Sequence, residues 1–195
     1  MERMETLDLL LCQGFGSLSK KIQCFQRMAS DATREETNIS HLAMIVNNGL
    51  SVFESTTLNW NGKEGVQLND YEPWIKHYNG HVWLKKLYFA RQPEHLQRCN
   101  CFVNDNLGMP YENGIMGYSE LLLCGLRLDR FVRLFYPEYK PLETKSPHCT
   151  ELDAKCLQAC SLLKSSAIPN RLPPWVWWKW IDDLLEVESK LFQLK

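Results

Sequence analysis

Residues 40–56 read SHLAMIVNNGLSVFEST, with two β-rich runs on either side of Asn47-Asn48-Gly49. An Asn-Gly pair between such runs is a strong hairpin signal, because both turn positions need a positive φ. The sequence therefore predicts two antiparallel strands, over residues 39–46 and 50–56, joined by a tight turn.

The register of this hairpin determines which side chains share a face of the sheet. With Asn48-Gly49 as the loop, four pairs lie opposite each other: Val46 with Ser51, Met44 with Phe53, Ala43 with Glu54, and His41 with Thr56. His41 and Glu54 are then diagonal neighbours on one face, where the carboxylate can orient the imidazole. A three-residue loop would instead place Glu54 on the opposite face, and a lone strand histidine is more often a structural group.

Strand and helix signals continue on both sides of the hairpin. The expected segments are strands over residues 6–13, 65–68 and 81–89, helices over residues 17–28 and 70–77, and a polar loop or flap over residues 30–38. Together with the hairpin they predict one α+β domain over residues 1–195, built on a small antiparallel sheet.

The second half of the chain is expected to be mainly helical. A helical section covers residues 93–134 with a break at residues 107–110, and an irregular connection follows. Residues 150–163 are predicted to form a helix with one buried stripe. That stripe contains Leu152, Cys156, Ala159, Cys160 and Leu163.

Tryptophans are concentrated near the end of the chain, in Pro173-Pro174-Trp175-Val176-Trp177-Trp178-Lys179-Trp180. Because proline favours a helix start, we predict a Trp-rich helix over residues 174–192. Its packed face is expected to contain Trp175, Trp178, Ile181 and Leu185, while Trp177 or Trp180 covers an edge. The alternative is that residues 175–180 offer a peripheral lipid contact or a glycan platform.

Composition and charge limit the classes of function. The 195 residues are 45% hydrophobic and 23% charged, which is typical of one globular domain. The 22 basic and 23 acidic side chains give a net charge of −1, which argues against a general nucleic-acid binder. No apolar run approaches about 20 residues and no secretory signal is visible, so we expect no transmembrane segment and a cytoplasmic location.

The eight cysteines are expected to be free thiols, because cytoplasmic chains are kept reduced and no C-x-x-C pair suggests zinc or redox chemistry. Cys99-x-Cys101 is a weak metal signal, and a tetrahedral site would need a second paired cluster. We therefore expect no metal and no cofactor.

Cys149 differs from the other cysteines because it follows the Pro147-His148 break and begins an amphipathic helix. Backbone N–H groups and the dipole at a helix start favour a thiolate and could hold an oxyanion. The alternative is that Cys149 merely occupies an N-cap position. His148 competes with His41 as the base, but adjacent side chains at a helix start diverge, so we prefer His41 and place His148 in the wall of the site.

Four motifs carry a resemblance to a known family. In chain order they are Ser40-His41-Leu42-Ala43-Met44-Ile45-Val46, Val52-Phe53-Glu54, Gly108-Met109-Pro110-Tyr111 and His148-Cys149-Thr150-Glu151-Leu152. With the strand-turn-helix order near the N-terminus, the chain resembles the circularly permuted NlpC-type papain-like hydrolases, the YiiX-like group, over most of its length. The resemblance implies a papain-like α+β fold in which the antiparallel sheet packs on the nucleophile helix.

The resemblance also implies roles for three residues. Cys149 would be the nucleophile, His41 the general base and acid, and Glu54 the group that orients the imidazole. This assignment agrees with the register argument.

Two departures from the family pattern concern the substrate side of the site. Leu7-Asp8 stands where the family tends to carry Gly-Asp, and His148 stands where an aromatic residue is usual. The expected substrate-binding residues are Asp8, Tyr111 and His148.

The implied function is that of a peptidase or amidase that cleaves an amide through a thioacyl-enzyme intermediate, with a bacterial cell-wall peptide as one substrate. One alternative is a lipid or acyl amidase, or an acyltransferase, of the same fold. Others are a non-catalytic module that binds a partner or lipid beside the tryptophans, and a zinc-dependent module.

Overall fold

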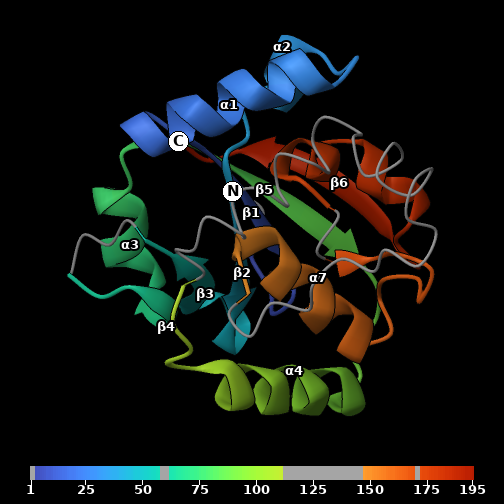
Figure 1. The fold of residues 1–195 in the computed structure, drawn as a ribbon. Coiled ribbons are helices and arrows are strands. Elements are labelled where there is room, and N and C mark those ends of the chain that lie inside the picture. Colours follow the sequence, from blue (N-terminus) through green and yellow to red (C-terminus); the bar gives the residue numbers. More distant parts are fainter. Residues whose placement is uncertain (1–2, 58–61, 112–146, 170–171) are drawn as a thin grey trace, which may run out of the picture.

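A six-stranded antiparallel sheet forms the centre of the molecule. The computed structural model describes residues 3–57, 62–111, 147–169 and 172–195. Its strands are β1 (Leu9–Gly14), β2 (His41–Val46), β3 (Ser51–Thr56), β4 (Gly65–Asp70), β5 (Gly80–Tyr88) and β6 (Glu188–Gln193). They lie in the order β4-β3-β2-β1-β5-β6, so the expected α+β fold with an antiparallel sheet is confirmed (Figure 1).

Helices surround this sheet. They are α1 (Ser17–Ala29), α2 (Arg34–Thr37), α3 (Tyr71–His77), α4 (Pro93–Asn106) and α7 (Cys149–Ala159). In Figure 1, α7 lies in front of the strands, while α1 and α4 lie on opposite sides of the molecule. Of the expected helical section over residues 93–134, α4 is present and residues 112–134 lie outside the described part of the chain.

Each face of the sheet has its own hydrophobic core. Along β1, Leu9 and Leu11 join the core that α7 completes, whereas Leu10 and Cys12 join the core that contains Trp74 of α3. This alternation follows from the two-residue period of a strand, because successive side chains point to opposite faces. The helix α7 is therefore fixed against one face of the strands that carry His41 and Glu54.

The predicted hairpin register is confirmed. Met44 pairs with Phe53, Ile45 with Val52 and Val46 with Ser51. The loop itself is longer than the predicted pair Asn48-Gly49. It includes a 3-10 turn, η1 (Asn47–Gly49), and φ is 52° at Asn47, 55° at Asn48 and 94° at Gly49. Three consecutive residues in the left-handed region account for the use of Asn and Gly here.

Residues 30–38, expected as a loop or flap, contain the short helix α2. Thr33 is its N-cap and accepts a hydrogen bond from the Glu36 N–H, while the Glu36 carboxylate accepts one from the Thr33 N–H. This reciprocal capping box satisfies two otherwise unpaired donors and stabilises the single turn.

The predicted Trp-rich helix over residues 174–192 is wrong. The segment forms two short 3-10 helices, η3 (Pro174–Trp177) and η4 (Trp180–Asp183), and then the strand β6. Trp175 and Trp177 are both buried. Residues two apart lie on different sides of a helix, so this segment is packed against protein on more than one side. The strand β6 pairs along the edge of β5, where strand hydrogen bonding outweighs helix formation.

Trp177 or Trp180 was expected to cover an edge, and the side chain of Trp177 is instead fully buried in the core completed by α7. The buried stripe of α7 agrees with the prediction at Leu152, Cys156 and Cys160. All described cysteines are free thiols. No helix in the described residues is long and apolar enough to cross a membrane.

Candidate active site

Three side chains from three elements meet at one end of the sheet: Cys149 at the start of α7, His41 at the start of β2 and Glu54 in β3. The segment before α7 is attached to β3, because the Ser55 hydroxyl donates a 2.6 Å hydrogen bond to the Pro147 carbonyl. Ser55 is fully buried, so this contact holds the start of α7 beside the hairpin.

His41 lies between the other two side chains. Its Nε2 is 2.8 Å from Glu54 Oε2, and the Cys149 thiol hydrogen bonds to the imidazole. With Nε2 committed to Glu54, Nδ1 is the ring nitrogen left to face Cys149. The structure thus brings together the three residues that the hairpin register and the helix start had singled out.

Two further residues hold the carboxylate of Glu54. Asn69 Nδ2 donates a 3.0 Å hydrogen bond to Oε1, and Trp74 Nε1 donates one of 2.8 Å to the same oxygen. The other oxygen is left for His41. Sequence reasoning missed both donors, because Asn69 joins Glu54 only through the pairing of β3 with β4.

Electrostatics favour a charged thiolate and imidazolium. Burial raises the pKa of Cys149, but the hydrogen bond and charge of His41, followed by the charge of His148, lower it below the usual thiol value. Burial lowers the pKa of His41, but Cys149 and the Glu54 carboxylate raise it above the usual value. An opposite charge at hydrogen-bond distance stabilises the ionised form of both partners. The Leu42 N–H, which hydrogen bonds to the sulfur, acts in the same direction.

A cavity of about 360 Å³ opens beside these side chains. Its lining includes His41, Glu54, Cys149, Tyr111 and, on the other walls, Gly14, Leu18, Ser19, Ile22, Trp74, His77 and Tyr78. Tyr111, expected to contact substrate, therefore lies in this wall. Trp74 and Tyr78 pack together with ring centroids 5.0 Å apart and were not predicted from the sequence.

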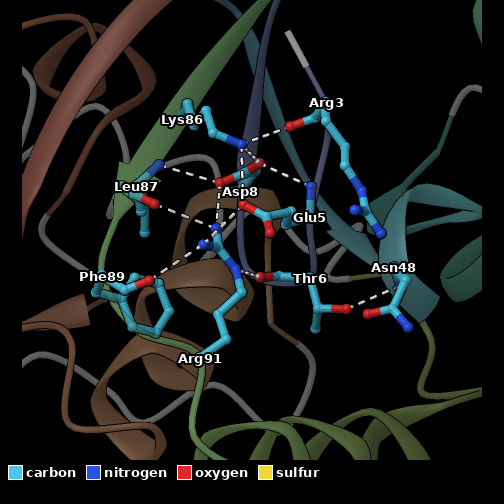
Figure 2. Close-up of polar contacts among 9 residues, drawn as sticks. All are labelled: Arg3, Glu5, Thr6, Asp8, Asn48, Lys86, Leu87, Phe89 and Arg91. Atoms are coloured by element: carbon cyan, nitrogen blue, oxygen red, sulfur yellow. Dashed lines mark hydrogen bonds and ion pairs between the residues drawn. The ribbon is translucent and has the colours of Figure 1, made fainter.

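Asp8, expected to contact substrate, does not line the cavity. It precedes β1 at the end of that strand away from Gly14, and Figure 2 shows it inside a polar cluster. Asp8 Oδ1 is 2.6 Å from Arg91 Nη2 and accepts a 3.0 Å hydrogen bond from the Leu87 N–H. The carboxylate is fully buried and partnered by protein groups, so it joins the first strand to β5 and the segment after it.

His148, expected in the wall of the site, is the N-cap of α7 and is not among the residues that line the cavity. Its Nδ1 is 3.2 Å from Glu151 Oε2 instead. Cys149 is the first residue of α7, so the alternative in which the cysteine itself is the N-cap does not hold.

Asp153, one turn after Cys149 on α7, was also missed by sequence reasoning. Its side chain is fully buried, and neither carboxylate oxygen has a hydrogen-bond partner among the described residues. Burial, followed by the negative charge of Cys149, raises the pKa of Asp153 far above its usual value. The carboxyl group is thus held as the neutral acid beneath the nucleophile.

Cys99 and Cys101, whose spacing is a weak metal signal, lie in different environments. Cys99 is buried against α7, whereas Cys101 is exposed. Within the described ranges, no group of three or more His, Cys, Asp or Glu side chains is placed to hold a metal ion.

Comparison with known proteins gives a fold relationship. No family profile matches the sequence, and no curated protein matches it. Among solved structures, the chain is similar to one described as the metalloprotein YiiX from Escherichia coli O157:H7, with a TM-score of 0.52 and 13% identity. The match covers 100% of this chain and 98% of that chain. The chain therefore has a YiiX-like α+β fold.

Proposed function

We propose that this chain is a cysteine-dependent hydrolase that cleaves an amide bond through a thioacyl-enzyme intermediate. One observation carries the proposal: the Cys149 thiol hydrogen bonds to His41, which Glu54 holds at 2.8 Å, beside a cavity. A nucleophile, a base and a third group that orients the base are the arrangement that activates a thiol for acyl transfer.

In the proposed reaction, the Cys149 thiolate attacks the carbonyl carbon and forms a C–S bond. The His41 imidazolium then gives its proton to the leaving nitrogen as the C–N bond breaks, which leaves a thioester. His41 next takes a proton from water, whose oxygen attacks the thioester carbon. The C–S bond then breaks, which releases the carboxylic acid and restores the Cys149 thiolate beside the His41 imidazolium. Glu54 keeps its hydrogen bond to Nε2 throughout and fixes the plane of the ring.

The start of α7 supports stabilisation of the oxyanion. The first N–H groups of a helix have no partner within it, and the side chain of the N-cap residue His148 does not cap them. N–H groups so placed can donate to the negative oxygen of a tetrahedral intermediate, a contribution of about 3 to 4 kcal/mol per donor in known enzymes.

The cavity lining favours an acyl amide over a cell-wall peptide as substrate. Among the described residues that line it, none is Lys or Arg, so no permanent cation is present to bind the carboxylates of such a peptide. Leu18, Ile22, Trp74 and Tyr78 supply an apolar wall that suits a hydrocarbon acyl group. An acyl amidase or acyltransferase is thus the favoured form of the proposed activity.

YiiX is described as a metalloprotein, but the described residues of this chain do not fit a metal ion. No cluster of three or more ligating side chains is present in them, and His41 Nε2 is engaged by Glu54. The proposed steps therefore use protein groups and water only.

Alkylation across pH tests the proposal without a known substrate. Iodoacetamide would be applied from pH 5 to pH 9, and mass spectrometry would locate the modified cysteines in the wild type and in His41→Ala. We expect Cys149 to react well below pH 8 and to lose this reactivity in His41→Ala, because the imidazolium stabilises the thiolate. The exposed thiols Cys24 and Cys101 serve as internal references.

A matched control replaces a histidine outside the site. His81→Ala, on β5, should leave the alkylation profile of Cys149 unchanged. If Cys149 reacts no faster than Cys24 and Cys101, the hydrolase proposal is wrong and a non-catalytic binding module becomes the better account. If the thiol is reactive, the rate of p-nitroaniline release is then compared between a fatty-acyl anilide and a peptide anilide. The faster substrate identifies the substrate class.

A further inference from the structure

A second histidine lies directly beside the nucleophile, outside the pair formed by His41 and Glu54. His148 is the N-cap of α7 and Cys149 is the next residue. The Nδ1 atom of His148 is 3.2 Å from Glu151 Oε2, and the side chains of the two residues are 12% and 3% exposed. In a capping box, the carboxylate at this position accepts a hydrogen bond from the backbone N–H of the N-cap residue. Here the Glu151 carboxylate contacts the imidazole of the N-cap residue instead.

Glu151 has a second partner, which is a lysine. Lys155, one turn further along α7, places Nζ 2.7 Å from Glu151 Oε1. Burial raises the pKa of Glu151, but the hydrogen bonds and charges of His148 and Lys155 lower it to about 2. The carboxylate is therefore ionised at every pH at which a thiol hydrolase works.

An ionised Glu151 without partners would oppose a thiolate at Cys149, because both would be negative within the first turn of one helix. The contacts of Glu151 with His148 and Lys155 offset this negative charge. His148 directly precedes Cys149 in the chain, and its charge is felt at the Cys149 thiol. This charge lowers the pKa of Cys149 in addition to the effect of His41.

We propose that His148 is a positioning residue which, held by Glu151 and Lys155, stabilises the Cys149 thiolate independently of His41. This inference rests on the proposed hydrolase function and adds a second source of thiol activation to it. His148 touches neither the cavity nor the reacting atoms, so its effect passes through the charge state of Cys149. Among the described residues, the charge of His41 on β2 is also felt at Cys149, and the charge of Cys149 is felt at Cys12 on β1, Tyr78 after α3 and Asp153 on α7.

The test compares His148→Gln with His148→Lys. Glutamine can still hydrogen bond to Glu151 but carries no charge, whereas lysine keeps the charge and loses the ring. The second-order rate of iodoacetamide with Cys149 would be measured from pH 5 to pH 9. We expect His148→Gln to lower the rate below pH 7 by about 3- to 10-fold, to leave the plateau at high pH unchanged, and His148→Lys to keep the wild-type rate.

A second variant keeps the inference testable if His148→Gln does not fold. Lys155→Met removes the cation paired with Glu151, so the carboxylate opposes the thiolate more strongly and the rate below pH 7 should again fall, by about 2- to 3-fold. Lys190→Met on β6 is the matched control and should have no effect.

The outcomes separate the two claims. A wild-type Cys149 with ordinary thiol reactivity overturns the hydrolase proposal. A reactive wild type whose profile is unchanged in His148→Gln and Lys155→Met overturns only the role of His148. A loss in His148→Lys equal to that in His148→Gln also overturns it, because a merely structural role of the ring would produce that result.

Discussion

Trp74 Nε1 donates a 2.8 Å hydrogen bond to Glu54 Oε1, while the other oxygen of the same carboxylate lies 2.8 Å from His41 Nε2. The carboxylate is therefore held at both oxygens, at one by the indole and at the other by the imidazole. The helix α3, which contributes no group to the proposed bond-breaking steps, is in this way connected to the orientation of the base.

Trp74→Phe should weaken both stability and thiol activation. The change removes a buried donor to a charged acceptor, which costs about 1.5 to 3 kcal/mol, in addition to the loss of ring volume. A carboxylate with one donor fewer orients His41 less well, so alkylation of Cys149 at pH 6 should slow. Urea unfolding and the alkylation rate measure the two effects.

Trp177→Phe is the matched control for this change. Trp177 is fully buried, and within the part of the chain that the structure describes its indole nitrogen has no hydrogen-bond partner. The substitution removes the same ring volume but breaks no hydrogen bond. Trp177→Phe should therefore be less destabilising than Trp74→Phe and should leave the alkylation rate of Cys149 unchanged. Equal losses of stability in the two variants would contradict a role for the Trp74 donor.

Asp153→Asn should stabilise the protein in a pH-dependent manner. The pKa of Asp153 is raised in the folded state, so the wild type has its full stability below the unfolded value and loses stability as pH rises above about 4. The amide does not ionise and avoids this loss. We expect a gain of about 1 to 3 kcal/mol at pH 7.5 that vanishes near pH 3.5, measured by urea unfolding. A difference independent of pH would show that ionisation is not its cause.

Gly14→Ala should distort the wall of the cavity. A Cβ at this position would lie 2.3 Å from Ser19 Oγ and 3.0 Å from Ser19 Cβ. The overlap should cost about 1 to 3 kcal/mol, and Ser19→Ala in the same chain should recover part of the loss by removing the closer atom. A double-mutant cycle in urea measures this recovery, and strictly additive losses would exclude the clash.

Asp8→Asn should reduce stability without changing the chemistry of Cys149. The substitution leaves Arg91 and Lys86, whose side chains are 12% and 9% exposed, without their buried anionic partner. Loss of one member of such a group costs about 3 to 5 kcal/mol. Asp105→Asn, on the exposed side of α4, should cost little. A changed pH profile of Cys149 alkylation in folded Asp8→Asn protein would restore Asp8 to the site.

The sequence predicts those parts of the site that depend only on residues close together in the chain. The register of one hairpin places His41 beside Glu54, because strand side chains alternate with a period of two. Likewise, the position of Cys149 after Pro147-His148 predicts a helix start. Neither inference requires knowledge of how distant segments pack.

The parts that were missed or wrong depend on packing between distant segments. Asn69 and Trp74 reach Glu54 only after β4 pairs with β3, and Asp153 is recognisable as unpartnered only when its neighbours are known. Near the end of the chain, the proline and tryptophan pattern favoured a helix, but the free edge of β5 accepts residues 188–193 as a strand. Tertiary context overrides local propensity in such segments.

The hydrogen bond from Ser55 to Pro147 joins residues 92 positions apart, whereas His41 and Glu54 are separated by 13. Contacts between near neighbours form faster than contacts between distant ones. A partly folded chain can thus possess the oriented imidazole while its cysteine remains a thiol of ordinary acidity. The rate of Cys149 alkylation at low pH would then report the docking of α7 onto the sheet rather than formation of the sheet itself. The thiol would become reactive only in the last step of folding.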